Sequence, residues 1–230
     1  MTNTLTVQMT KREQLWGAIY LLLTLGFLPF LFPFCLNLLF PALNSVAQNF
    51  LYFLCNFLCV ALILRKFLWA SLDQLGAHPI RLLLTVFFGL VIYFFLNYQI
   101  TMLLILLAPE FSNVNDNSIA ALATENFTLL AAGTVLLVPM AEECLYRGVV
   151  FGSLLKKHTV LAYAVSILLF SFVHLVPYIG TYDAVVLLLC AIQYLPAGFC
   201  LAWVYQKSDS IFAPILMHTV VNAMGMFSVR

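Results

Sequence analysis

Seven apolar runs divide the sequence, and each has the length that a helix needs to cross a lipid bilayer, about 17 to 25 residues. Segments of this kind form helices because unpaired backbone groups are costly in hydrocarbon. Hydrophobic residues make up 64% of the 230 residues and charged residues only 8%, whereas soluble domains carry about a quarter charged residues. The sequence therefore predicts an all-α fold, a polytopic membrane helix bundle with about seven transmembrane helices, at 15–40, 46–64, 82–107, 127–155, 160–176, 184–205 and 211–229.

The basic residues between these runs indicate how the bundle is oriented. The connections after the first, third and fifth runs contain no Lys or Arg. Eight of the ten basic residues lie before the first run and after the second, fourth and sixth, and only Arg147 and Arg230 lie elsewhere. The eight are Lys11, Arg12, Arg65, Lys66, Arg81, Lys156, Lys157 and Lys207. Because Lys and Arg accumulate on the cytoplasmic side of a membrane, the pattern predicts a cytoplasmic N-terminus and an external C-terminus.

Two connections are longer than simple turns. Residues 66–81 space their apolar side chains like an amphipathic helix on the membrane surface, with a plain linker as the alternative. Residues 109–125 are polar and are expected to form an external loop. We divide this single membrane domain into an N-terminal part of three spans, 1–126, and a C-terminal part of four spans, 127–230. The basic residues form no continuous patch, so no nucleic-acid partner is expected, and the sequence indicates no oligomeric state.

Three charged residues lie inside the fourth apolar run, where a charge is expensive and usually faces the protein interior. Glu143 and Arg147 are four residues apart with the acid first, an arrangement that favours an ion pair on one helix face. Glu142 points about 100° away around the same helix. The spacing therefore predicts a structural Glu143–Arg147 pair and a Glu142 side chain that is left free.

Three further polar side chains lie deep in apolar runs. They are His174 in the fifth run and His218 with Asn222 in the seventh. Counting about 1.5 Å per residue from the nearest cytoplasmic end puts them at depths similar to that of Glu142. His218 and Asn222 are four residues apart and share one helix face. We expect these groups to meet in one buried hollow.

The stretches "EECLYR", "FSFVH" and "HTVVN" together resemble the three ordered motifs of the CAAX protease and bacteriocin-processing (CPBP) family of intramembrane endopeptidases, which includes the type II CAAX prenyl proteases. The resemblance covers roughly 127–229, and the first three spans carry no recognised motif. It implies a protease of the cell membrane, and for a chain of this kind a prokaryotic one. Its partners would be the lipid bilayer and a membrane-associated peptide or protein substrate, such as a prenylated peptide or a bacteriocin precursor.

The resemblance marks Glu142, His174, His218 and Asn222 as catalytic positions. Peptide hydrolysis needs a base that activates water and donors for the developing oxyanion. Glu142 fits the base, His174 would orient the water, and His218 with Asn222 would donate to the oxyanion. Phe170 is expected to pack one turn from His174 and to support the site together with Glu143 and Arg147.

Other chemistries and functions remain alternatives. A zinc site would use Glu142, His174 and His218, since two His and a carboxylate match catalytic zinc ligands. The histidines lie on separate helices and Asn is a poor zinc ligand, so a metal-free glutamate mechanism without a cofactor is favoured. A transporter with a buried proton relay would also contain Glu and His. A non-catalytic scaffold, such as an immunity or regulatory protein, would keep the hollow without cleaving anything.

Overall fold

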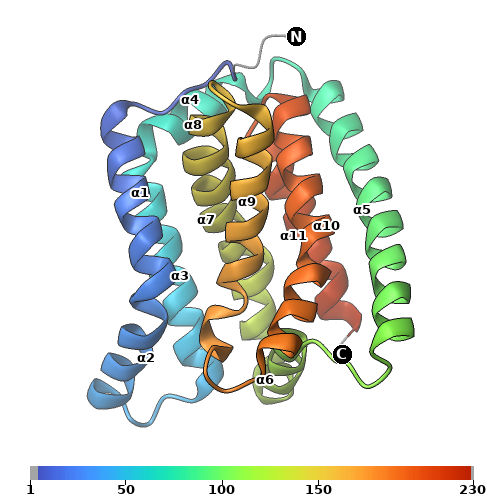
Figure 1. Ribbon diagram of the computed structural model, residues 1–230. Helices are drawn as coiled ribbons and strands as arrows, with labels where there is room; N and C mark the ends of the chain where they lie inside the picture. Colours follow the sequence, from blue (N-terminus) through green and yellow to red (C-terminus); the bar gives the residue numbers. More distant parts are fainter. Residues whose placement is uncertain (1–4, 229–230) are drawn as a thin grey trace.

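The computed structural model describes residues 5–228, and these fold into a bundle of helices (Figure 1). Helices satisfy all their interior backbone groups within one segment, which suits so apolar a chain. The elements are α1 (Lys11–Gly26), α2 (Leu28–Leu39), α3 (Ser45–Ile63), α4 (Arg65–Leu75), α5 (Pro79–Leu107), α6 (Val114–Ala131), the π-helical η1 (Ala132–Leu137), α7 (Val138–Glu143), the π-helical η2 (Cys144–Phe151), α8 (Gly152–Leu155), α9 (Thr159–Val173), the 3₁₀ turn η3 (Val176–Tyr178), α10 (Ala184–Ser208) and α11 (Phe212–Ser228).

Each of the seven predicted spans corresponds to a helical stretch. Four helical stretches in the described range are long and apolar enough to cross a membrane, and α1 with α2 forms a fifth if the bent pair counts as one span. The 67° bend between α1 and α2 lies next to Pro29 in the first turn of α2, where proline lacks an N–H for a continuing helix. Helices α9 and α11 are apolar but shorter, 15 and 17 residues, and their crossing stays a prediction.

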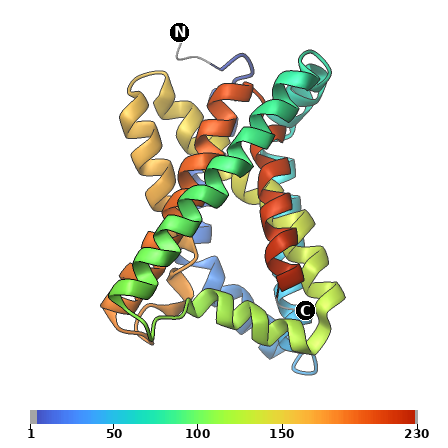
Figure 2. The ribbon, with the colours of Figure 1, turned by 90° about the vertical axis from the view of Figure 1, so that its right-hand side faces the viewer.

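Helix α6 corrects the prediction of a loop over 109–125, because residues 114–125 are helical. Figure 2 shows this part of α6 lying across the lower end of the bundle. Asn113 caps its start by accepting from the backbone of Asn115 and Asp116. This helix was not predicted because many of its residues are polar, whereas the expected spans were apolar runs. The backbone then leaves helical geometry at Asn126 (φ −157°, ψ 90°), and the Asn126 side chain accepts from Leu129 N at 3.0 Å, which caps the next helical stretch.

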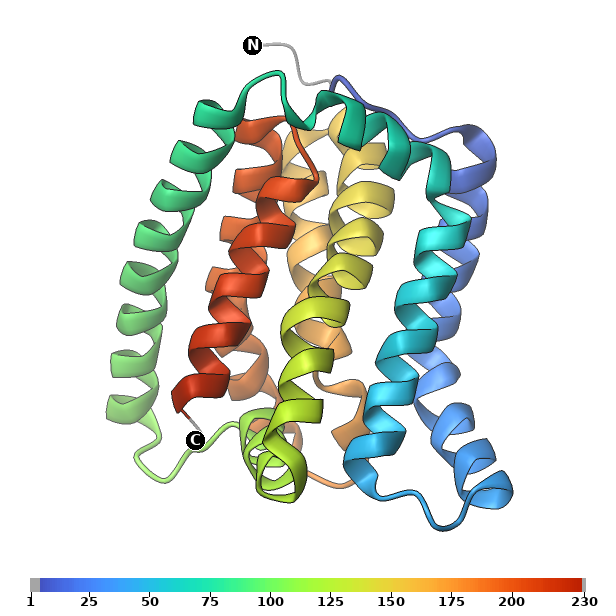
Figure 3. The same ribbon diagram turned by 180° about the vertical axis from the view of Figure 1, so that it is seen from behind.

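Residues 127–155 continue from this kink as one rising helical stretch, called here the central helix. It consists of the end of α6 followed by η1, α7, η2 and α8, and Figure 3 shows it between α3 and α11. It contacts α1, α3, α9 and α11, and its buried side chains join the main hydrophobic core with residues of both chain halves. The predicted site residues Glu142, Glu143 and Arg147 therefore lie in the middle of the bundle.

Helix α4 confirms a helix within the connection 66–81, and Figure 3 shows it lying across the upper end of the bundle. Its buried face is Phe67, Leu68 and Ser71. Leu72 and Leu75, two further apolar residues of this helix, are exposed. The first and last described residues lie at opposite ends of the bundle (Figure 1), as an odd number of crossings requires.

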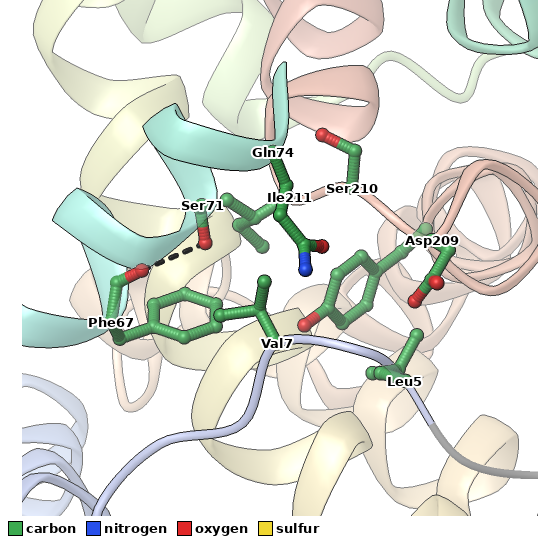
Figure 4. A pocket seen from close by; sticks show the side chains of 9 residues that line it. Leu5, Val7, Phe67, Ser71, Gln74, Asp209, Ser210 and Ile211 are labelled. Atoms are coloured by element: carbon green, nitrogen blue, oxygen red, sulfur yellow. Dashed lines mark hydrogen bonds between the residues drawn. The ribbon is translucent and has the colours of Figure 1, made fainter. Parts of the chain in front are cut away.

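The chain before α1 packs across the same upper end. Thr6 N donates to Asp209 Oδ1 at 2.8 Å, and Lys156 Nζ donates to Gln8 Oε1 at 2.6 Å. Figure 4 shows Leu5 and Val7 beside Phe67 and Ile211 around a small hollow. The hollow encloses about 10 Å³, room for roughly one water molecule, so it is too small for a peptide.

Glu13 fastens two helix starts at this end and is 5% exposed. One carboxylate oxygen accepts from Thr10, completing a capping box, and the other accepts from Phe67 N at 2.8 Å at the start of α4. We expect Glu13→Ala to lower the free energy of unfolding by roughly 2 kcal/mol, since a cap and a buried N–H partner are both lost. Thermal unfolding in detergent measures this. Asp73→Ala, at an exposed position of α4, should stay within about 0.5 kcal/mol, and equal midpoints for the two variants would contradict the role of Glu13.

Candidate active site

Glu143 is fully buried and binds two cationic or proton-bearing groups through one oxygen. Its Oε1 accepts from Arg147 Nη1 at 3.1 Å, which confirms the ion pair predicted from the spacing. The same oxygen lies 2.8 Å from His218 Nδ1 on α11. The sequence pattern predicted that His218 meets Glu142 and did not indicate this contact with Glu143. Glu143 therefore connects the central helix to α11 as well as holding Arg147.

Arg147 connects the central helix to two more helices. Its Nη2 donates to the carbonyl of Gly198 on α10 at 3.0 Å, and its guanidinium lies 4.5 Å from the centre of the Phe170 ring on α9. A Cβ at Gly198 would come within 3.3 Å of the Ile167 backbone, so α10 approaches α9 closely here and a larger residue would push them apart by a few tenths of an ångström. The buried charges of Glu143 and Arg147 offset each other, and the pair holds four elements together.

Phe170 lies between the two histidines of the predicted site. Its ring centre is 4.9 Å from that of His174 and 5.7 Å from that of His218. The Tyr146 ring packs edge-on against it at 6.0 Å. Phe170 is 2% exposed, and it contacts His174 as predicted. Both imidazoles therefore pack against one phenyl ring, which explains how helices far apart in the sequence bring them together.

His174 ends α9 and its ring is held on three sides. Its Nδ1 lies 2.8 Å from the Phe170 carbonyl, and a carbonyl can only accept, so Nδ1 carries the proton. The other nitrogen, Nε2, then has its lone pair available in the neutral ring. The face of the ring stacks on Tyr194 of α10, with centres 4.4 Å apart and planes 22° apart.

The hydrogen bond of His218 likewise assigns the roles of its two ring nitrogens. The carboxylate of Glu143 accepts, so the Nδ1 of His218 donates. In the neutral ring Nε2 is then an acceptor, and in the protonated ring it is a donor. The Glu143 contact thus leaves Nε2 as the nitrogen of His218 that can act on a substrate.

Asn222 donates through Nδ2 to the carbonyl of Thr134 at 2.8 Å. Thr134 lies in η1, where the π-helical register pairs Val138 N with the Gly133 carbonyl. The next pair in that register would join residue 139 to Thr134, and Pro139 has no N–H. Pro139 thus leaves the Thr134 carbonyl without a backbone donor, and Asn222 binds it instead. The second Nδ2 hydrogen of Asn222 has no partner in the described chain.

Glu142 is half-buried and makes no hydrogen bond or ion pair within the described residues, as the sequence predicted. Its Oε2 is buried without a partner. Three side chains interact with it electrostatically without a hydrogen bond or ion pair: Arg147 and Tyr146 on the central helix, and Tyr52 on α3. Sequence analysis missed both tyrosines because a tyrosine in an apolar run carries no charge signal. Tyr52 shows that α3 of the N-terminal part also borders the site.

The alternative zinc ligands, Glu142, His174 and His218, do not form a metal-binding cluster. No group of three or more His, Cys, Asp or Glu side chains in 5–228 has the arrangement to hold a metal ion. The Nδ1 atoms of both histidines already have protein partners. A zinc-bound histidine commonly makes such a bond with its second nitrogen, so the metal-free mechanism stays a prediction.

Comparisons with known proteins bear on the C-terminal part of the chain. Residues 124–224 match a family model described as type II CAAX prenyl endopeptidase Rce1-like. The curated UPF0177 protein YxdF of Lactococcus lactis subsp. lactis (strain IL1403) is 32% identical over 95 residues, which cover 41% of this chain and 47% of that protein. The matched part thus spans about half the length of this relative. No solved structure matches.

Proposed function

Residues 124–224 match the Rce1-like family of type II CAAX prenyl endopeptidases, and from that premise we propose that this integral membrane protein is an intramembrane endopeptidase. The observation that carries the proposal is the contrast between two adjacent carboxylates. Glu143 is bound by Arg147 and His218, whereas Glu142 makes no hydrogen bond or ion pair among the described residues. A carboxylate inside a membrane helix with a buried, unpaired oxygen costs free energy, and a catalytic role explains why it is kept.

In the proposed reaction Glu142 takes a proton from a water molecule, and the hydroxide attacks the carbonyl carbon of the scissile peptide bond. His174 orients that water through Nε2, whose lone pair the Phe170 carbonyl leaves available. When the tetrahedral intermediate collapses, the C–N bond breaks and Glu142 returns its proton to the leaving amine. The products are one carboxylic acid and one amine, which become a carboxylate and an ammonium when the acid gives its proton to the amine, and Glu142 ends in its starting state.

The negative oxygen of the intermediate needs donors whose positions are fixed beforehand. Asn222 has one amide hydrogen bound by Thr134, which holds the side chain while the second hydrogen remains to donate. His218, held through Nδ1 by Glu143, donates from Nε2 when its ring is protonated. These two contacts were not predicted from the sequence. They support the predicted roles of His218 and Asn222, because they hold both donors in place.

The proposed substrate is a peptide segment associated with the membrane, either prenylated or a precursor such as that of a bacteriocin. The site lies inside a bundle of apolar helices, and many of the large apolar side chains on the outside of α5 and α10 are exposed, as lipid contact requires. A peptide that reaches Glu142 therefore has to enter from the bilayer or from its surface.

A cleavage assay tests this function. Purified wild type in detergent is incubated with prenylated and unprenylated membrane-associated peptides, with and without chelator, beside His174→Ala and His158→Ala. We expect cleavage by wild type and by His158→Ala, whose histidine is exposed, unaffected by chelator. His174→Ala should lose about 100-fold or more in kcat. Cleavage that chelator stops would refute the metal-free mechanism. Folded protein that cleaves no peptide would favour the non-catalytic scaffold.

A further inference from the structure

Tyr194 on α10 is the one aromatic residue in the described chain whose ring stacks face to face on a histidine of the site. The phenol ring covers one face of the His174 imidazole, and Phe170 packs against the same imidazole at a steeper angle, 61°. The hydrogen bond to the Phe170 carbonyl fixes one atom, Nδ1. One hydrogen bond alone still allows the imidazole ring to tilt. The plane of the imidazole therefore depends on the rings packed against it.

The Tyr194 hydroxyl is itself anchored by the first residues of α6. Asn115 Nδ2 donates to it at 3.0 Å. The hydroxyl lies 3.3 Å from Asp116 Oδ1 and 3.4 Å from Asn113 Oδ1, both of which can accept its proton. Asn113 is held in turn, because it caps α6 and donates to Gln193 Oε1 at 3.0 Å. The start of α6 therefore fixes the phenol at its polar end while the ring packs on His174.

We propose that Tyr194 is a positioning residue, which sets the plane of the His174 ring and is itself held by the start of α6. This rests on the proposed function for its effect on rate, whereas the orientation of His174 can be measured without any activity. The Nε2 lone pair of His174 has to point at the attacking water. If the ring can tilt while keeping its Nδ1 hydrogen bond, the lone pair points in the required direction for only part of the time.

Helix α6 also connects Tyr194 to the helix that carries Glu142. The same helix runs from Asn113 at its cap to the kink at Asn126, and from there the chain enters the central helix that carries Glu142. The element that anchors Tyr194 therefore also sets where the Glu142 helix starts. The two residues proposed to bind water are connected through one surface helix, which the sequence analysis took for a loop.

Two substitutions separate the ring from the hydroxyl. Tyr194→Leu removes the stacked ring, and we expect kcat to fall by about 10- to 100-fold, the usual cost of losing a supporting partner, with KM changed less than about twofold. Tyr194→Phe keeps the ring and loses only the anchoring hydroxyl, so its kcat should fall much less. The same small loss in kcat is expected for Asn115→Ala. Phe199→Leu, an aromatic-to-leucine change at an exposed position of α10, serves as the matched control and should keep the wild-type rate.

A double-mutant cycle distinguishes positioning from general loosening of the fold. If Tyr194 acts through His174, Tyr194→Leu should lower the rate no further in a His174→Ala background. An equal fractional loss in both backgrounds would overturn the proposal, because it would mean that Tyr194 acts independently of His174. Retention of full activity by Tyr194→Leu would overturn it as well.

Nuclear magnetic resonance of protein with ¹⁵N-labelled histidine tests the same point without a substrate. We expect His174 to show one neutral tautomer, with the proton on Nδ1, in wild type and in Tyr194→Phe. In Tyr194→Leu its two nitrogen signals should shift toward averaged values. Unchanged His174 signals in a folded Tyr194→Leu variant would overturn the positioning role. If no peptide is cleaved by wild type, the proposed function fails while this measurement still decides the role of Tyr194.

Discussion

Glu142→Gln is expected to abolish measurable peptide cleavage while leaving the fold intact. An amide cannot accept the proton of the attacking water, and loss of a general base costs about 10²- to 10⁴-fold in rate. The loss should appear in kcat rather than in KM, because the amide keeps the size of the side chain. Since Glu142 has no hydrogen bond or ion pair in the described part of the chain, its replacement breaks no contact. The thermal midpoint should equal that of wild type or exceed it.

Two controls sharpen this result. Glu125→Gln, at an exposed position of α6, should change neither rate nor midpoint. Glu143→Gln, one residue along from Glu142, removes the charge that Arg147 and His218 both bind, so it should lower the midpoint. Adjacent glutamates would thus separate into one that affects activity and one that affects stability. Normal cleavage by a folded Glu142→Gln variant would end the role of Glu142 as the base.

Arg147→Met is expected to cause the largest loss of stability of the single changes considered. It leaves the carboxylate of Glu143 buried with His218 alone, and removing one partner of a buried ion pair typically costs about 3 to 5 kcal/mol. The contacts of Arg147 with Gly198 and Phe170 are lost as well. We expect poor recovery of folded protein from the membrane and a much lower midpoint in detergent. Arg65→Met, at an exposed position, is the matched control and should behave as wild type.

The double variant Glu143→Leu/Arg147→Met tests the reason for that loss. With both charges gone no uncompensated charge is buried, and stability should recover most of the deficit. Activity should not return, because His218 then lacks the carboxylate that fixes its Nδ1. If the double variant is as unstable as Arg147→Met, the loss arises from packing of the arginine rather than from the unpaired charge.

Features that depend on one helix could be predicted from the sequence. In a bilayer the backbone has to satisfy its own hydrogen bonds, so each long apolar run became a helix, and the expected spans match α1 with α2, α3, α5, the central helix, α9, α10 and α11. The Glu143–Arg147 pair and the Phe170–His174 contact follow from a spacing of four residues, and the structure has both. The same spacing predicted that Glu142 takes no part in that ion pair.

Features that depend on how helices turn against one another were decided only by the tertiary structure. The sequence supplies the depth of His218 but not its partner, which proved to be Glu143. It also gave no sign that Asn222 binds the Thr134 carbonyl or that Tyr52 borders Glu142. Residues 114–125 form a helix whose polar residues hold Tyr194 against His174. The physical reason is that spacing along one helix fixes angles around its own axis, whereas contacts between helices depend on their rotation, depth and tilt, which packing of the whole bundle sets.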